Sequence, residues 1–114
     1  PGNHDRLGAA RYARYFDKII GWRRFEIKTD SGLLALVCTH VPIHPGSLSR
    51  GRYSARVINV HGHTHTREVK TPAGDIDVRY LNVCVERTDY APIALNDVVA
   101  MVLRRPAARA DIVA

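Results

Sequence analysis

The first half of the chain alternates between helical and extended hydrophobic patterns. Residues 7–20 carry apolar side chains at helical spacing and predict an amphipathic helix that ends at Gly21. Residues 22–28 alternate apolar and charged side chains, imperfectly, which predicts a half-buried strand. The continuous apolar run at residues 33–40 predicts a strand buried on both faces, and residues 29–32 predict a turn between the two strands.

The second half of the chain shows the same mixture. Residues 41–55 are rich in Pro, Gly and Ser and predict a long loop, which is followed by a buried strand at residues 56–61. Residues 67–86 predict a hairpin whose second strand is long. Residues 91–105 end in a predicted helix, with Asn96 as its N-cap.

Together these elements predict an α/β fold with one modest core. We expect a single domain over residues 1–105 and a flexible tail over residues 106–114. No apolar run is long enough to span a bilayer, so no membrane partner is expected. Cys38 and Cys84 lie in apolar runs, where we expect buried, reduced thiols. Such cysteine usage favours a cytoplasmic location.

The net charge of the chain does not by itself indicate which class of partner the protein binds. The 114 residues include 17 Lys and Arg against 11 Asp and Glu, a formal net charge of +6. This charge suits a phosphate-bearing partner, and it suits an ordinary solvated surface equally well. The basic residues are spread along the chain rather than clustered, which argues against a dedicated nucleic-acid patch.

The histidines carry the clearest chemical signal. His40 ends one apolar run, and His61, His63 and His65 follow another. In α/β sheets, binding sites form in the crevice outside the ends of strands. Taken alone, residues 60–66 fit either a metal site or a polar strand end with satisfied histidines.

Three short blocks occur in a defined order: Gly2-Asn3-His4-Asp5, Thr39-His40 and Gly62-His63-Thr64-His65. An amide, several imidazoles and nearby carboxylates are ligands typical of transition-metal hydrolases. In this order the blocks resemble the calcineurin-like metallophosphoesterases, in particular a small phage and bacterial branch of that family. The resemblance covers residues 1–100. It implies a sandwich of two mixed β-sheets flanked by helices, of which this chain would hold the C-terminal part.

The resemblance also implies roles for individual residues. Asn3, His40 and His63 would ligate the second of two divalent metal ions, and His65 would reach the first. His4 would be catalytic, by donating a hydrogen bond to a phosphate oxygen or by protonating the leaving group. The implied reaction is hydrolysis of a phosphate ester by metal-bound hydroxide. The implied metals are Mn, Fe, Zn, Ni or Co.

Two other blocks of that family, Asp-x-His and Gly-Asp-x-x-Asp, do not occur in this sequence. They supply the carboxylate that bridges both metals, two further ligands of the first metal and the aspartate that orients the catalytic histidine. We therefore expect part of a phosphoesterase domain with its N-terminal ligand blocks missing. We expect these 114 residues by themselves to be inactive or nearly so.

Several alternatives stay open at this point. The chain could be a non-catalytic scaffold of the same fold, or a nuclease of the same family with nucleic acid as its substrate. The sequence leaves the phosphate-ester substrate and the oligomeric state undecided. His44 and Arg52 are candidate substrate contacts in the long loop. Asn82 and Glu86 either support the histidine ligands or form ordinary hydrogen bonds at a strand end, and His61 is expected to point away from the ligands.

Overall fold

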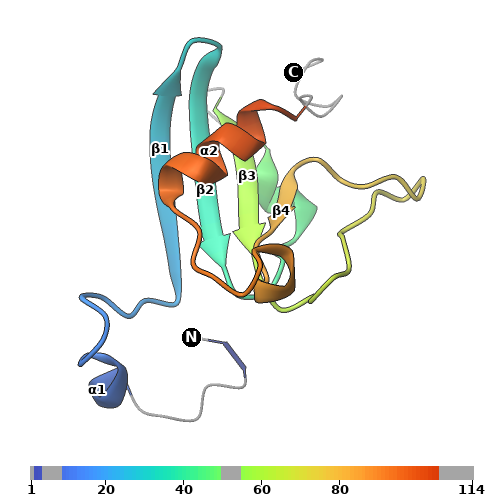
Figure 1. Ribbon diagram of the computed structural model, residues 1–114. Helices are drawn as coiled ribbons and strands as arrows, with labels where there is room; N and C mark the ends of the chain where they lie inside the picture. The colour runs from blue at the N-terminus through green and yellow to red at the C-terminus, as the bar shows by residue number, and fades with distance from the viewer. Residues whose placement is uncertain (1, 4–8, 50–54, 106–114) are drawn as a thin grey trace.

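The computed structural model describes residues 2–3, 9–49 and 55–105. Its centre is a four-stranded mixed sheet with the strand order β1-β2-β3-β4 (Figure 1). The strands are β1 (Trp22–Thr29), β2 (Gly32–Thr39), β3 (Arg56–His61) and β4 (Tyr80–Asn82). The helices are α1 (Ala9–Tyr12) and α2 (Leu95–Leu103), with the 3-10 turns η1 (Pro45–Leu48) and η2 (Val85–Arg87). These elements confirm the predicted α/β class.

The first two strands form a tight antiparallel hairpin. Thr29 and Gly32 pair across a two-residue turn, and Gly32 has a φ of 122°, which favours glycine. The Thr29 hydroxyl donates a hydrogen bond of 2.7 Å to the carbonyl oxygen of Gly32. The turn predicted at residues 29–32 is therefore confirmed.

The other strand pairs are parallel. β2 pairs with β3, and β3 pairs with β4, both in the parallel sense. The carboxyl ends of these three strands therefore meet at one edge of the sheet, where Figure 1 shows the arrowheads of β2 and β3. This edge receives the residues that follow each strand.

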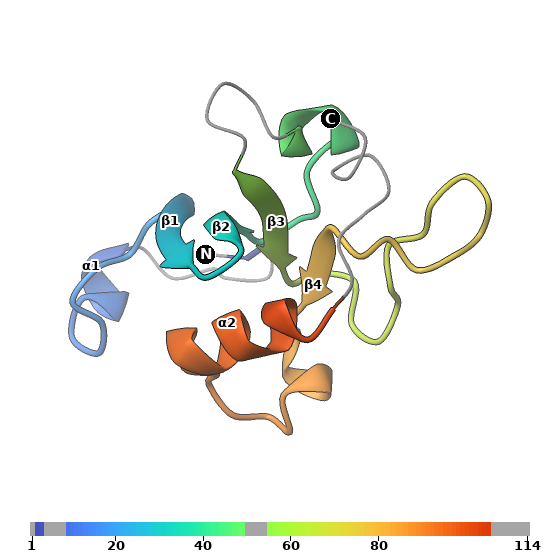
Figure 2. The same cartoon turned by 90° about the horizontal axis from the view of Figure 1, so that it is seen from above.

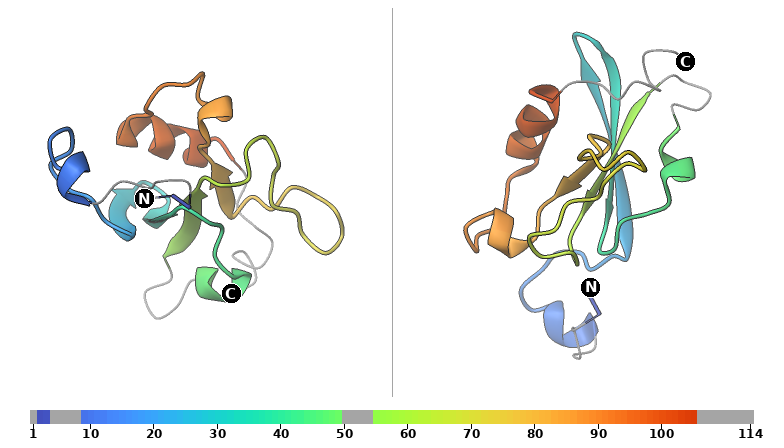
Figure 3. Two further views of the ribbon diagram at one scale, coloured as in Figure 1. Left: turned by 90° about the horizontal axis from the view of Figure 1, so that it is seen from below. Right: turned by 90° about the vertical axis from the view of Figure 1, so that its right-hand side faces the viewer.

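Apolar side chains pack on both faces of the sheet. On one face, Val98 and Val102 of α2 are buried against Leu34, Leu36, Ile58, Val60 and Leu81. On the other face, Leu48 of η1 and Ala55 are buried with Ala35, Val57 and Tyr80. Figure 2 and the right-hand view of Figure 3 show α2 and η1 on opposite sides of the sheet. The prediction that the strand at residues 33–40 is buried on both faces is confirmed.

The polar side chain of Asn59 lies fully buried in β3. Its amide nitrogen donates hydrogen bonds to the carbonyl oxygen of Val37 and the hydroxyl of Thr39, both at 2.9 Å. Its amide oxygen accepts a bond of 3.0 Å from the backbone N–H of Ile43. Asn59 therefore ties β3 to the end of β2 and to the segment that follows His40.

The helix predicted over residues 7–20 is wrong for most of that range. Within the described residues, α1 is limited to Ala9–Tyr12, and the segment after it is not helical. Phe16, on the predicted apolar face, is exposed. In Figures 1 and 2, α1 lies away from both faces of the sheet. A helix this short needs a packing partner for its apolar face, and the described residues offer none here.

The hairpin predicted over residues 67–86 is also largely wrong. Only one antiparallel bridge, between Lys70 and Ile76, forms there. β4 is short and pairs with β3 instead. It ends where the Asn82 side-chain oxygen accepts a 2.9 Å hydrogen bond from the backbone N–H of Cys84, because this local bond turns the chain out of the sheet. Cys84 therefore lies outside a strand.

The last helix forms at the predicted place but is not capped by Asn96. Its N-cap is Ala94, with no side-chain hydrogen bond, and Asn96 lies exposed within the first turn.

Both cysteines, Cys38 and Cys84, are half-buried free thiols. Within the described ranges, no helix combines the length and apolar character needed to cross a membrane.

Replacing Asn59 by Ala should lower the free energy of unfolding by about 2 kcal/mol or more, because it removes three side-chain hydrogen bonds of a fully buried amide. The exposed Asn96→Ala variant is the matched control and should change stability by no more than about 0.5 kcal/mol. Urea unfolding of both variants measures the difference. Equal losses in the two variants would contradict the structural role of Asn59.

Candidate metal centre

The parallel register of β2 and β3 sets the position of the candidate site. Thr39 pairs with His61 at the carboxyl ends of these strands. The next residues, His40 and Gly62, remain side by side, and the Gly62 N–H donates a 2.9 Å hydrogen bond to the carbonyl oxygen of His40. Two strand-end segments that are 22 residues apart in sequence are thereby held together.

Three polar atoms converge at this edge of the sheet. The Oδ1 atom of Asn3 lies 2.8 Å from Nε2 of His40 and 3.2 Å from Nδ1 of His63. The two ring nitrogens of His40 and His63 are themselves 3.2 Å apart. The rings meet edge to face, with centroids 5.1 Å apart and an interplanar angle of 75°. Asn3, His40 and His63 are called the amide–histidine triangle below.

Hydrogen bonds cannot satisfy all three contacts of the triangle. The amide oxygen only accepts, and each ring nitrogen carries at most one hydrogen. If both nitrogens are protonated, both can donate to the oxygen, but the contact between the two histidines then has no hydrogen bond. If one is protonated, fewer contacts are satisfied. A cation placed between the three atoms would attract all three lone pairs at once.

The triangle also has the dimensions of one face of an octahedral coordination sphere. Metal–ligand bonds of about 2.0–2.2 Å place neighbouring ligand atoms about 2.8–3.1 Å apart in an octahedron. The observed contacts of 2.8, 3.2 and 3.2 Å lie close to this range. A neutral amide oxygen and two imidazoles suit a transition-metal dication. The residues present therefore fit such an ion.

The amide oxygen of Asn3 is the third potential metal ligand of the triangle, beside the two histidine nitrogens. Over the ranges that the structure describes, no three His, Cys, Asp or Glu side chains gather into a group that could hold a metal. The site is therefore two histidines with one amide, and charged ligands are not part of the triangle.

Gly2 is required for the close approach of the N-terminal segment. A Cβ atom on Gly2 would lie 2.8 Å from Cε1 of His40, closer than such atoms come in proteins. The glycine before Asn3 thus allows the backbone to pass against the imidazole ring. This gives a packing reason for the first residue of the Gly-Asn-His-Asp block.

The segment that carries the histidines after β3 has an unusual backbone. His63 and His65 have φ angles of 68° and 55°, in the left-handed region that non-glycine residues rarely adopt. Asn82 of β4 stabilises this segment: its buried side chain donates hydrogen bonds to the carbonyl oxygens of His65 (2.7 Å) and Arg67 (3.1 Å). Strained conformations of this kind persist where surrounding contacts hold them, and they cluster at functional sites.

Glu86 holds the ring of His65. Its Oε1 atom lies 2.7 Å from Nδ1 of His65, and this hydrogen bond lowers the pKa of the Glu86 carboxyl. Carboxylates that bind one ring nitrogen of a histidine fix its tautomer and orient the other nitrogen as a metal ligand. Both side chains line a pocket of about 300 Å³ together with Asn3, His40 and His63.

The remaining predicted residues fall into two groups. His4 and Arg52 lie outside the described residues. His44 caps η1, with its Nδ1 accepting a 3.0 Å hydrogen bond from the N–H of Gly46, and it is not among the residues that line the pocket. His61 is fully buried, with Nδ1 2.9 Å from the carbonyl oxygen of Gly62. The substrate role of His44 stays a prediction.

Sequence reasoning left Asn82 and Glu86 undecided between supporting the histidines and ordinary strand-end bonding. The structure brings both of them to His65. The sequence could not decide between these roles, because the contacts of Asn82 and Glu86 with His65 depend on where β4 ends in space. The ligand roles of Asn3, His40, His63 and His65 stay predictions.

Comparisons of the chain with protein-family models, with curated proteins and with solved structures found no match.

Removing the His65 side chain should raise the pKa of the Glu86 carboxyl toward its ordinary value of 4.5, because the hydrogen bond from Nδ1 of His65 is the largest cause of its lowered pKa. Carbon-detected NMR of the carboxyl groups, over a pH titration of the metal-free chain, measures this midpoint in the wild type and in His65→Ala. The control is His44→Ala, which should leave the Glu86 midpoint unchanged. An identical midpoint in all three proteins would contradict the contact.

Proposed function

We propose that this chain supplies the ligands of one metal ion in a phosphate-ester hydrolase of the calcineurin-like metallophosphoesterase type. The observation that carries the proposal is the amide–histidine triangle, whose three ligand atoms lie 2.8–3.2 Å apart. The order of the three sequence blocks supports the same proposal, and Asn3 of the first block lies beside His40 and His63, which follow β2 and β3.

Asn3, His40 and His63 would hold the ion in this proposal. Divalent ions in such hydrolases activate water for attack on phosphorus and offset the charge of the phosphoryl group. The neutral donors of the triangle leave the positive charge of the ion largely uncompensated, which favours binding of an anionic phosphate. The net charge of +6 acts in the same direction.

His65 and Glu86 would form the beginning of a second subsite. Because Nδ1 of His65 is engaged by Glu86, its Nε2 is the ring atom left for a ligand. Among the described residues that line the pocket, Glu86 is the one that is acidic. The family resemblance assigns the other ligands of this subsite to Asp-x-His and Gly-Asp-x-x-Asp blocks, which these 114 residues do not contain.

Two further parts of the proposal rest on the resemblance alone. His4 would donate a proton or a hydrogen bond to the substrate, and it follows Asn3 directly in the sequence. The four-stranded sheet would be one half of a two-sheet sandwich.

Titration of the chain with Mn²⁺ in a calorimeter should show one bound ion per chain. His40→Ala and His63→Ala should each weaken this binding by about tenfold or more, since even groups outside the coordination sphere change metal affinity by that factor. The matched control is His44→Ala, whose ring caps η1 and which should bind the ion as the wild type does. Equal affinity in all four proteins would contradict the proposed ligands.

Two further measurements separate the hydrolase from other metal-binding proteins. The chain loaded with metal should bind inorganic phosphate, and the metal-free chain should not. Turnover of bis-p-nitrophenyl phosphate by these 114 residues alone should be absent, because they lack the carboxylate expected to bridge two ions. Turnover by these 114 residues that His63→Ala abolishes would contradict the proposal that they hold only part of the catalytic site. A failure to bind any metal would favour a non-catalytic scaffold.

A further inference from the structure

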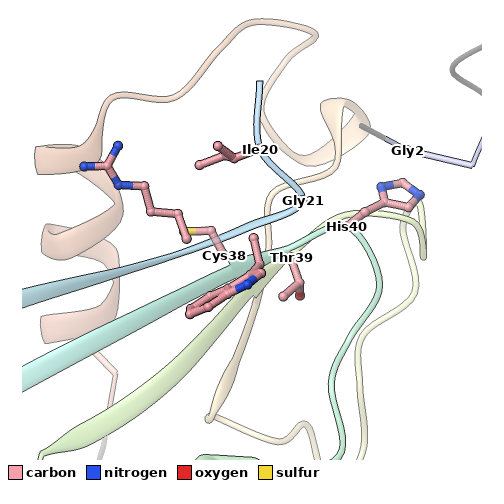
Figure 4. Close-up of a pocket in the computed structure, with 8 residues that line it drawn as sticks. Gly2, Ile20, Gly21, Cys38, Thr39 and His40 are labelled. Carbon is pink, nitrogen blue, oxygen red and sulfur yellow. The ribbon is translucent and has the colours of Figure 1, made fainter. Parts of the chain in front are cut away.

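A second pocket of about 300 Å³ adjoins the amide–histidine triangle at the start of β1. Its lining includes Ile20, Trp22, Arg23, Thr39 and His40. Figure 4 shows Ile20, Gly21, Thr39 and His40 around it. His40 is shared with the triangle, so the pocket and the candidate metal centre meet at this side chain. The volume is at the lower end of the range of small-molecule sites.

Trp22 is not a core residue of the sheet. It is 64% exposed, although it belongs to a regular strand. Alternate residues of a strand share a face, and those that share the face of Trp22 are Arg24, Glu26 and Lys28. All three are exposed and charged, and Arg24 pairs with Glu26 at 3.1 Å. Within these 114 residues, Trp22 therefore shares an exposed face of β1 with charged side chains and is not part of the packed core.

The position of Trp22 links it to the candidate metal centre. Trp22 pairs with Thr39 across the hairpin, and His40 is the next residue along the chain. The residue that carries the indole is therefore paired with the immediate neighbour of His40, a proposed ligand of the triangle. An exposed aromatic side chain at the mouth of a polar site is a surface on which a flat ring can stack.

Arg23 adds positive charge to the same pocket. Its guanidinium lies 4.7 Å from the centre of the Phe25 ring, a cation–π contact that holds the side chain in place. A guanidinium held in this way can bind a phosphate or ribose oxygen with little loss of side-chain freedom. By the alternation of the strand, Arg23 lies on the same face of β1 as Phe25 and on the opposite face from Trp22, so the indole and the guanidinium line the pocket from the two faces of β1.

From these observations we propose that the pocket binds the base of a nucleotide by stacking on Trp22, while the nucleotide phosphate lies at the amide–histidine triangle. The proposal rests on the proposed function, and it names the substrate class of that site as a phosphate ester of a nucleoside. A nucleobase is favoured over a smaller ring because every base offers a broad stacking face, which an exposed indole can bind from one side.

Trp22 is the single tryptophan of the chain, so its fluorescence reports on this pocket alone. Adenosine monophosphate should quench the fluorescence in a saturable way. Ribose 5-phosphate, which lacks the base, should bind about tenfold more weakly by calorimetry, since stacking of one base contributes roughly 1–3 kcal/mol. Equal affinity of the two compounds would overturn the proposal.

Variants of Trp22 test the same contact. Trp22→Ala should bind adenosine monophosphate no better than ribose 5-phosphate, and Trp22→Phe should bind it with intermediate affinity. The control is Tyr15→Ala, an exposed aromatic outside the pocket, which should bind like the wild type. Unchanged affinity in Trp22→Ala overturns the proposal. Phosphotyrosine that binds as tightly as the nucleotide, and through Trp22, overturns the choice of a nucleobase.

Metal binding separates this proposal from the proposed function. Trp22→Ala should bind Mn²⁺ like the wild type, because the indole is not a ligand. If the wild type binds no metal but binds the nucleotide through Trp22, the hydrolase is contradicted and the base site is supported. If the wild type binds metal and phosphate but does not discriminate between the two sugar phosphates, the base site alone is overturned.

Discussion

The parallel pairing of β2 with β3 is the constraint on which the candidate site depends. The register of Thr39 with His61 fixes where the two strands end, and the hydrogen bond between Gly62 and His40 continues the pairing for one more residue. Two histidines from separate segments are then brought within 3.2 Å of each other. The apolar clusters on both faces hold this register, because a shift by one residue would exchange the side chains that pack against α2 with those that pack against η1.

Around this constraint, polar contacts are concentrated at the carboxyl edge of the sheet. Asn59 fixes the segment after His40 from inside the core, and Asn82 fixes the segment that contains His65. The left-handed backbone of His63 and His65 is held by such contacts rather than by local preference. An edge held in this way would keep the proposed ligand atoms in place before any ion binds, as metal sites require of their surroundings.

The parts of the fold that were predictable are those with a local cause. The apolar runs at residues 33–40 and 56–61 indicated buried strands, and the histidines at their ends indicated a shared edge. Other features depend on contacts between distant residues. Within the described part of the helical pattern at residues 7–20, α1 is limited to Ala9–Tyr12 and lies away from the faces of the sheet. β4 pairs with β3 rather than with its neighbour in sequence. The contact of Glu86 with His65 follows from that pairing, which explains why the sequence left it open.

The central claim is that Asn3, His40 and His63 bind one metal ion together. A crystal of the chain grown with Mn²⁺, measured by anomalous X-ray scattering, tests it most directly. The account predicts one anomalous peak bonded to Oδ1 of Asn3, Nε2 of His40 and Nδ1 of His63, at about 2.0–2.2 Å from each. A peak bound elsewhere, or none at this edge of the sheet, would contradict it.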